Sequence, residues 1–220
     1  MAKTRLSATY TDLRGRLGKQ VIARTRNGLV TKSVPRYRYP KNPARELGSM
    51  RMQLATAAWN EMSLEQADAW RNYASTLRKI EPVTLQEYSP TAKNAYIGLA
   101  TKFLQINPEG EIPLWPPTSD FIGDDLVVTC QSIAGGVRFT ASAQNSPGAA
   151  TEILFQKLAS VHRSPTKFYK SMLYHTFETG DLELDVPLEA GLYAFSYRFV
   201  KVSTGQMTEQ LLLGRVAVDG

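Results

Sequence analysis

The side chains in this sequence with the most chemical potential are the basic ones near its start. Residues 1–50 hold 12 Lys and Arg against 2 Asp and Glu, whereas residues 51–220 hold 14 against 18. A segment with a net charge of +10 ahead of a body with a net charge of −4 predicts an acidic partner for that segment. Nucleic acid phosphates and an acidic protein surface both meet this condition.

The basic residues lie on and around a predicted β-hairpin at 19–38. Two runs with strand character, 20–24 and 29–33, flank an Asn-Gly pair, which favours a two-residue turn because both turn positions need positive φ. A two-stranded ribbon is marginally stable alone, so we expect it to lie on another subunit, on nucleic acid or on its own chain. The residues that we expect to form this interaction surface are Arg14, Arg16, Lys19, Arg24, Arg26, Asn27, Gly28, Lys32, Arg36, Tyr37, Arg38 and Tyr39.

No group of residues in the sequence predicts an enzyme. His162 and His175 are 13 positions apart, Cys130 is the single cysteine, and no spacing typical of a zinc site occurs. We expect both histidines on the surface or facing along a strand, and Cys130 as a small hydrophobic residue in a core strand. Neither a Gly-rich phosphate loop nor a G-x-S-x-G motif is found. We therefore expect no catalytic residue, no cofactor and no metal site.

Three carboxylates near the end of the chain form a second candidate surface. Asp181, Glu183 and Asp185 alternate along a run with strand character, which places them on one face of a strand. Like charges at this spacing repel, so the face must be solvated, bind a cation such as calcium, or meet a basic partner. We interpret it as an acidic counter-surface for the basic arm of a neighbouring copy, with a solvated face as the alternative.

A helix is predicted at 43–61, with Asn42 as N-cap and Pro43 at the first helical position. Its apolar residues recur at helical spacing and predict the face that packs into the core. These residues are Leu47, Met50, Leu54, Ala57 or Ala58, and Met62.

A second helix is predicted at 64–78, because Ser63 and Gln66 match a capping box. Trp59 and Trp70 lie on either side of this break. We expect them to pack together inside an antiparallel helical hairpin, and the alternative is a pair of aromatic anchors at an interface.

A third helix is predicted at 90–106, and the prolines at 108–122 then predict a stiff linker. Beyond the linker, seven runs with strand character recur with turn residues between them, which is typical of an antiparallel β-sandwich. The seven runs are 126–131, 137–142, 152–158, 171–177, 182–186, 192–202 and 207–218.

The residues at 186–193, Val-Pro-Leu-Glu-Ala-Gly-Leu-Tyr, resemble a corner of fibronectin type III and immunoglobulin-like modules. In that corner a tyrosine near the start of the penultimate strand bonds back to the preceding loop. The resemblance implies that Tyr193 makes this bond and that 192–202 and the final run form the last hairpin. The Trp that is typically buried in the third strand is absent here.

The first half resembles a group of poorly characterised proteins from phage and prophage gene clusters. Their pattern is a Gly-rich basic start, a hairpin, a helix led by Asn-Pro, and two tryptophans around a capping box. The matching residues are Gly15, Gly18, Asn27, Gly28, Asn42, Pro43, Arg51, Gln53, Trp59, Ser63, Gln66 and Trp70. The resemblance implies a structural role in a virion, and it carries no known chemistry.

The expected fold is α+β in two domains: a basic β-hairpin arm with a small helical domain, then an antiparallel immunoglobulin- or fibronectin III-like β-sandwich. The expected segments are the arm at 1–42, the helical domain at 43–107, the linker at 108–122 and the sandwich at 123–220.

These features and the resemblance predict a non-enzymatic phage virion structural protein, capsid-associated as a decoration, cement or minor head protein. A nucleic-acid-binding protein and a head–tail or tail component stay open as alternatives. The expected partners are other virion subunits, as a homo-oligomer or in a repeated lattice, and contact with DNA stays open. Since no apolar run approaches the roughly 18 residues of a membrane span and no signal peptide follows Met1, we expect synthesis in the host cytoplasm and then a place in the virion, without membrane contact.

Overall fold

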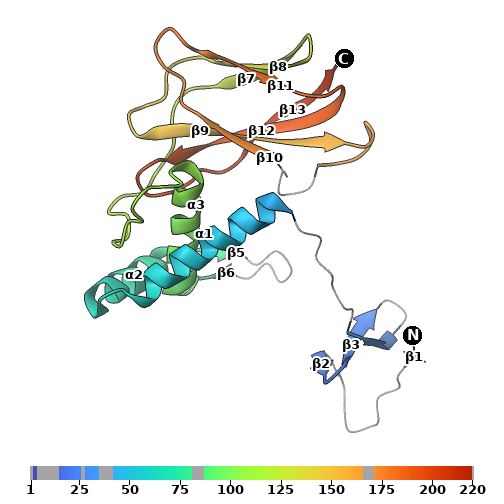
Figure 1. Cartoon of the computed structure of the whole chain (residues 1–220), viewed down its shortest axis with the longest axis vertical. Coiled ribbons are helices and arrows are strands. Elements are labelled where there is room, and N and C mark those ends of the chain that lie inside the picture. The colour runs from blue at the N-terminus through green and yellow to red at the C-terminus, as the bar shows by residue number, and fades with distance from the viewer. Residues whose placement is uncertain are drawn as a thin grey trace. The chain divides into compact units, whose positions relative to one another are not determined.

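The computed structural model describes residues 2–3, 15–25, 28–34, 42–80, 87–165 and 171–219. It divides the chain into two compact units, Met1–Pro43 and Ala44–Gly220, called here the N-terminal unit and the body. Three helices and several antiparallel sheets lie in the part that it describes (Figure 1). The prediction of a mixed α+β protein is confirmed at this level.

The described part of the N-terminal unit is a small antiparallel sheet of four strands in the order β1-β4-β3-β2. The strands are β1 (Ala2–Lys3), β2 (Gly15–Leu17), β3 (Gln20–Thr25) and β4 (Gly28–Ser33). The predicted hairpin is therefore the centre of a wider sheet, because β1 and β2 pair with its outer edges. The short strand that the sequence suggested at 6–10 lies outside the described residues.

The register of this hairpin differs from the prediction. A turn at Asn27 and Gly28 would pair Val30 with Thr25, but the structure pairs Val30 with Ala23 and makes Gly28 the first residue of β4. The observed register sets an apolar residue opposite Val30, and such cross-strand pairs stabilise a sheet. The connection between the strands is therefore at 26–27, outside the described residues.

The body begins with three helices, α1 (Pro43–Asn60), α2 (Leu64–Thr76) and α3 (Ala92–Ile106), close to the predicted spans. The capping box is confirmed, because Ser63 Oγ accepts from the Gln66 amide and Gln66 Oε1 accepts from the Ser63 amide. None of the described helices is long and apolar enough to cross a membrane.

The start of α3 corrects the prediction that it begins directly after Ser89. Its N-cap is Thr91, whose side-chain oxygen accepts a hydrogen bond from the Asn94 amide. β5 (Lys79–Ile80) and β6 (Glu87–Tyr88) pair in a two-stranded sheet, where the prolines at 82 and 90 predict a loop at 80–90.

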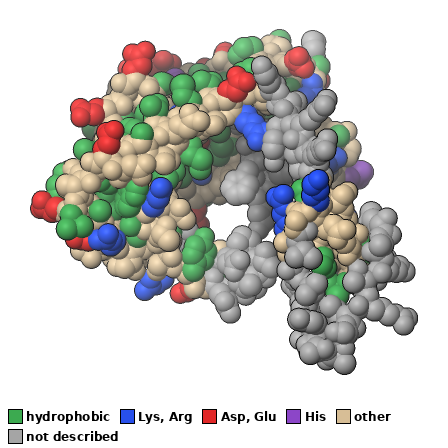
Figure 2. Space-filling view, turned by 60° about the horizontal axis from the view of Figure 1, so that its bottom comes forward, with side chains coloured by type: hydrophobic (Ala, Val, Ile, Leu, Met, Phe, Trp, Pro, Cys, Tyr) green, Lys and Arg blue, Asp and Glu red, His purple; other side chains and the backbone are tan. Residues whose placement is uncertain are grey.

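The helices differ in how many of their residues are buried. Ala55 is the one fully buried residue of α1, whereas α3 buries six. The stripe of Leu47, Met50 and Leu54 that we predicted to face the core is about half exposed. Two members of the predicted stripe, Ala58 and Met62, do contact the core, and Ala55 next to the stripe is its fully buried residue. Hydrophobic side chains are visible over much of the surface in Figure 2.

An aromatic cluster forms the core of the helical part. The rings of Trp59 and Trp70 both pack on Tyr96 of α3, with centroids 5.6 and 5.1 Å from it. Trp70 is 2% exposed, and its Nε1 donates to the carbonyl oxygen of Leu114 at 2.8 Å. Core packing is thus confirmed for Trp70, with Tyr96 between the two tryptophans.

The remaining strands form two antiparallel sheets, in the orders β11-β8-β7 and β10-β9-β12-β13 (Figure 1). Each of the seven predicted runs overlaps one of these strands. The strands are β7 (Val128–Ile133), β8 (Gly136–Ala141), β9 (Ala149–Leu158), β10 (Ser171–His175), β11 (Glu183–Pro187), β12 (Gly191–Lys201) and β13 (Leu211–Val218).

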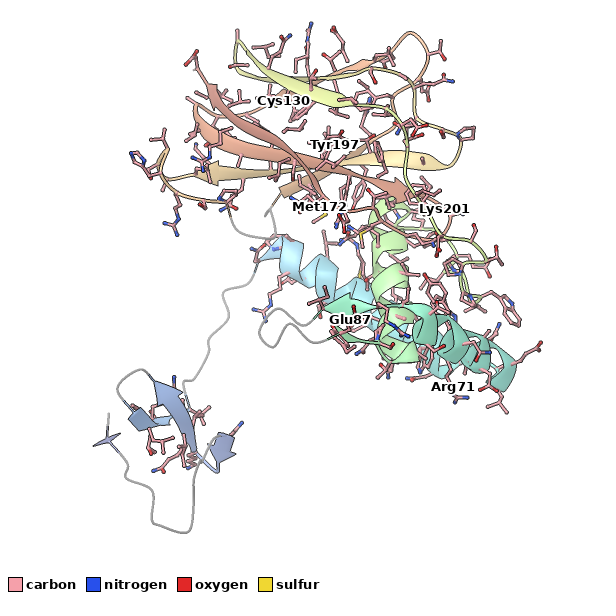
Figure 3. All side chains as sticks on the ribbon, turned by 180° about the vertical axis from the view of Figure 1, so that it is seen from behind. Arg71, Glu87, Cys130, Met172, Tyr197 and Lys201 are labelled. Carbon is pink, nitrogen blue, oxygen red and sulfur yellow. The ribbon has the colours of Figure 1, made fainter. Side chains whose placement is uncertain are left out.

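The two sheets share one hydrophobic core. Tyr193, Phe195, Tyr197 and Phe199 alternate along the sequence, which predicts one shared face of a strand, and all four lie in this core. Phe195 packs on Phe139 of the opposite sheet with ring centroids 5.4 Å apart. Figure 3 shows Cys130 and Tyr197 on the two sheets, and Cys130 packs half-buried against the same core. Tyr193 Oη donates to the carbonyl oxygen of Glu189 at 3.0 Å, which is the bond that the corner resemblance implied.

The segment at 107–120 is hydrogen-bonded to the loop after β12. Asn107 Nδ2 donates to the carbonyl oxygen of Val202 at 3.1 Å, and Gln206 Nε2 donates to that of Ser119 at 3.0 Å. Helices and sheets accordingly belong to one compact unit.

Candidate interaction surfaces

The sheet of the N-terminal unit combines cations and apolar residues on one face. The register places Arg16 opposite Val21 and Val21 opposite Lys32, so these three form a row across β2, β3 and β4. Residues directly opposite each other in an antiparallel sheet share a face. The next row, Gly15, Ile22 and Thr31, lies on the other face and holds no charge. In these two rows, one face therefore presents two cations beside Val21, and the other face presents Ile22.

Lys19 lies in the tight turn between β2 and β3. Gly18 supplies the φ of 57° at the first turn position, which favours glycine. Arg16 Nε donates to the Gly18 carbonyl at 3.0 Å, and the Lys19 carbonyl accepts from the Val34 amide at 2.9 Å. The turn is thus fixed to the end of β4, and the Lys19 side chain is exposed.

Of the other residues predicted for the interaction surface, the structure describes only the backbone of two. The backbone of Arg24 lies in β3, and that of Gly28 lies in β4. The predicted site residues outside the described ranges are Arg14, Arg26, Asn27, Arg36, Tyr37, Arg38 and Tyr39.

No side chain that the structure describes in the N-terminal unit is fully buried. Val21, Ile22, Leu29 and Val30 are all partly exposed. Four short strands without a closed core are marginally stable alone. The described part of this sheet therefore leaves its apolar side chains partly exposed.

The predicted acidic face contains a cation that sequence reasoning missed. Arg138 of β8 is the register partner of Asp185 and binds it through two hydrogen bonds of 2.7 Å. Arg138 Nη1 also lies 2.8 Å from Glu183 Oε2. Arg138 on the neighbouring strand is thus the basic partner of two of the three carboxylates, Glu183 and Asp185.

Arg138 changes the electrostatics of this face. Its hydrogen bonds hold the pKa of Asp185 below the ordinary value, and the two carboxylates raise the pKa of Arg138. Asp181 precedes β11 and forms a backbone bridge with Glu178. Asp181 is therefore the one member of the predicted trio without an ion pair among the described residues.

A second charge cluster is buried where α3 meets the four-stranded sheet. Glu152 of β9 is fully buried, and its Oε1 lies 2.8 Å from Lys102 Nζ while its Oε2 lies 2.5 Å from Arg198 Nε. The hydroxyl of Tyr174 accepts from Lys102 Nζ at 2.9 Å and lies 2.8 Å from Glu152 Oε1. The sequence held a weak signal for this cluster, since Glu152 and Lys102 interrupt apolar runs.

Lys102 and Arg198 keep the Glu152 side chain in its charged carboxylate form. Burial alone would raise its pKa, but hydrogen bonds and charge from Arg198 and Lys102 outweigh burial and lower it. Burial and the nearby Glu152 carboxylate raise the pKa of Tyr174, so its hydroxyl stays protonated. This arrangement holds a fixed carboxylate and has no open reacting atom, so it fastens a helix to a sheet.

The remaining reactive side chains stay apart. Burial raises the pKa of the Cys130 thiol, while His162 is exposed and His175 packs edge-on against Phe177 at 4.7 Å. No group of three metal-ligating side chains occurs among the residues that the structure describes. The acidic side chains on the face shown in Figure 2 are scattered over the body rather than gathered in one patch.

The sequence matches no known family model, and no curated protein or solved structure shows significant similarity to it.

Proposed function

We propose that this chain is a non-enzymatic structural protein of a phage virion that docks on neighbouring subunits through its basic N-terminal unit. One observation carries the proposal: the structural boundary coincides with the charge boundary. The N-terminal unit holds 11 of the 26 Lys and Arg but one of the 20 Asp and Glu, and none of its described side chains is fully buried. A charged sheet without a closed core is suited to binding and unsuited to standing alone.

The body supplies the other half of this proposal. Its helices and sheets have closed cores around Tyr96 and Phe195, so it folds without the N-terminal unit. Its net charge of −4 complements the +10 of that unit. Many weak contacts of this kind add up when copies repeat in a lattice.

The second half of the body is a fibronectin type III-like sandwich in this proposal. Its two sheets, of three and four strands, have the order expected of that architecture, and Tyr193 makes the corner bond. Phe139 packs on Phe195 in the core between the two sheets. The architecture suits a display or spacer role and implies no chemistry.

The virion setting comes from the resemblance of the first half to phage and prophage proteins. A capsid-associated role as a decoration, cement or minor head protein fits a compact body with a separate docking unit. A head–tail or tail component would use the same two parts.

Nucleic-acid binding is the second candidate, and one observation favours it. Arg16 and Lys32 share a face of the N-terminal sheet, and the arm sequence interleaves further cations with Tyr37 and Tyr39. Phosphate contacts and base stacking would use these residues. A salt titration tests this candidate, because phosphate binding is strongest at low salt; absence of DNA binding there removes it.

Sedimentation velocity tests the main proposal. The full chain should associate increasingly with concentration, and the chain lacking residues 1–43 should stay folded by circular dichroism and monomeric. If the truncated chain associates as the full chain does, the N-terminal unit is not the docking element.

A further inference from the structure

The body has a hollow beside α2 and α3. It has a volume of about 410 Å³ and lies between α2, α3, the chain before β7 and the loop after β12. We call it the Asp120 groove; its walls include Tyr73, Leu77, Leu99, Asp120, Phe121 and Met207. A second hollow, along residues 116–120, shares Tyr73 and Asp120 with it.

Buried contacts hold the walls of the groove in place. Gln206 is 7% exposed, donates from Nε2 to the Ser119 carbonyl at 3.0 Å and accepts at Oε1 from the Thr204 hydroxyl at 3.0 Å. Gly205 has a φ of 74°, and a Cβ there would come within 2.4 Å of the Leu99 carbonyl oxygen. The loop after β12 therefore approaches α3 as closely as only glycine allows, and the groove is formed before any partner binds.

Asp120 is the one charged residue that lines the groove. Its side chain is exposed, and it has no ion pair among the residues that the structure describes. Asp120 and Tyr73 both line this groove and the hollow beside it. Burial raises the pKa of Tyr73, and the Asp120 carboxylate adds to this effect. The groove thus presents one unneutralised carboxylate beside an aromatic side chain.

The surrounding side chains define what this carboxylate can bind. Tyr73 and Phe121 offer ring surfaces, and Met207 offers a flexible thioether. An arginine or lysine side chain can stack its charged end on such rings while it pairs with the carboxylate. An anion would be repelled, and a purely apolar ligand would bury Asp120 without a partner.

We propose that the Asp120 groove receives a basic side chain from the N-terminal unit of a second copy of this chain. The occupant follows from charge, because that unit carries +10 and leaves its described apolar side chains uncovered, while the groove offers one carboxylate among apolar walls. This inference rests on the proposed docking role and gives the docking partner a defined site.

Two matched variants of the full chain test the site by sedimentation velocity. Asp120→Asn removes the groove carboxylate, and Asp181→Asn removes an exposed carboxylate beside β11, which the sequence had suggested as the counter-surface. Asp120→Asn should weaken self-association about tenfold, as the loss of one partner of a close charge pair does, and Asp181→Asn should leave it unchanged. Circular dichroism checks that both variants fold, and Met207→Ala provides a second, uncharged change in the groove that should also weaken association.

The outcomes separate this inference from the proposed function. If the full chain associates and loss of residues 1–43 abolishes association, but Asp120→Asn and Met207→Ala behave like Asp181→Asn, the groove is overturned and the docking role stands. If the full chain is monomeric at every concentration, or the truncated chain associates equally well, both proposals fall. If the N-terminal unit bound the groove of its own chain, the sedimentation coefficient would not change with protein concentration. A sedimentation coefficient that rises with concentration therefore indicates binding between copies.

Discussion

The two compact units of this chain differ in where their hydrophobic side chains lie. In the body, Phe139, Ile153 and Phe195 have no exposed surface, and the four-stranded sheet has apolar contacts on both faces. In the N-terminal unit, the described residues of β3 and β4 are at best partly buried. The body therefore has closed hydrophobic cores, whereas the described apolar side chains of the N-terminal unit stay partly exposed.

The charges follow the same division. The body buries its one complete ion cluster around Glu152, with both carboxylate oxygens occupied. The N-terminal unit instead spreads Arg16, Lys19 and Lys32 over an open sheet and its turn. Buried charges in the body fix elements to each other, and exposed charges in the N-terminal unit are available to another molecule.

Truncation of one apolar residue in each unit should give the largest contrast. Phe195→Ala should lower the free energy of unfolding of the body by about 3–5 kcal/mol, because it opens a cavity between the sheets. Ile22→Ala should change it by less than about 1 kcal/mol, since it removes no closed packing. Urea unfolding followed by tryptophan fluorescence measures both, and similar losses for the two variants would contradict the division.

Neutralisation of the buried carboxylate should have the next largest effect. Glu152→Gln leaves Lys102 and Arg198 without a counter-charge and should cost about 3 kcal/mol of unfolding free energy. Glu183→Gln is the matched control in the exposed cluster of Arg138 and should cost less than about 1 kcal/mol. Equal costs in urea unfolding would show that the Glu152 cluster does not stabilise the body.

The pH dependence of stability should report the same carboxylate. The folded pKa of Glu152 is lowered, so its contribution is complete above the unfolded value of about 4.3 and is lost as pH falls toward the folded value. Between about pH 6 and pH 3, the wild type should therefore lose more unfolding free energy than Glu152→Gln does. If the unfolding free energies of the wild type and Glu152→Gln changed equally with pH, the Glu152 carboxylate would not stabilise the body.

The corner bond of Tyr193 should contribute least. Tyr193→Phe removes the hydroxyl that bonds the Glu189 carbonyl at 3.0 Å and keeps the ring in the core. The expected loss is about 1 kcal/mol, typical of one hydrogen bond. Thermal unfolding of the two proteins measures this, and an unchanged midpoint would mean that the bond adds nothing.

Local signals predicted the parts of the fold that depend on neighbouring residues. The capping box at Ser63 and Gln66 requires only one turn of helix, and the alternation of Tyr193 with Phe195 requires only one strand. Both were correct for that reason.

The features that the sequence did not predict depend on register and on distant partners. Arg138 meets Asp185 because of strand pairing 47 positions away, and Lys102 meets Glu152 50 positions away. The turn shift at Gly28 likewise reflects cross-strand pairing of Ala23 with Val30. No local pattern specifies such pairs, because several registers satisfy the same alternation.

The central claim is that the N-terminal unit completes its core only against a partner, and amide hydrogen exchange tests it most directly. In the dilute full chain, amides of β3 and β4 should exchange far faster than those of β12, and their protection should rise when the chain associates at high concentration. Equal protection of β3, β4 and β12 in the dilute chain would contradict the claim, because it would mean that the N-terminal unit is stable on its own.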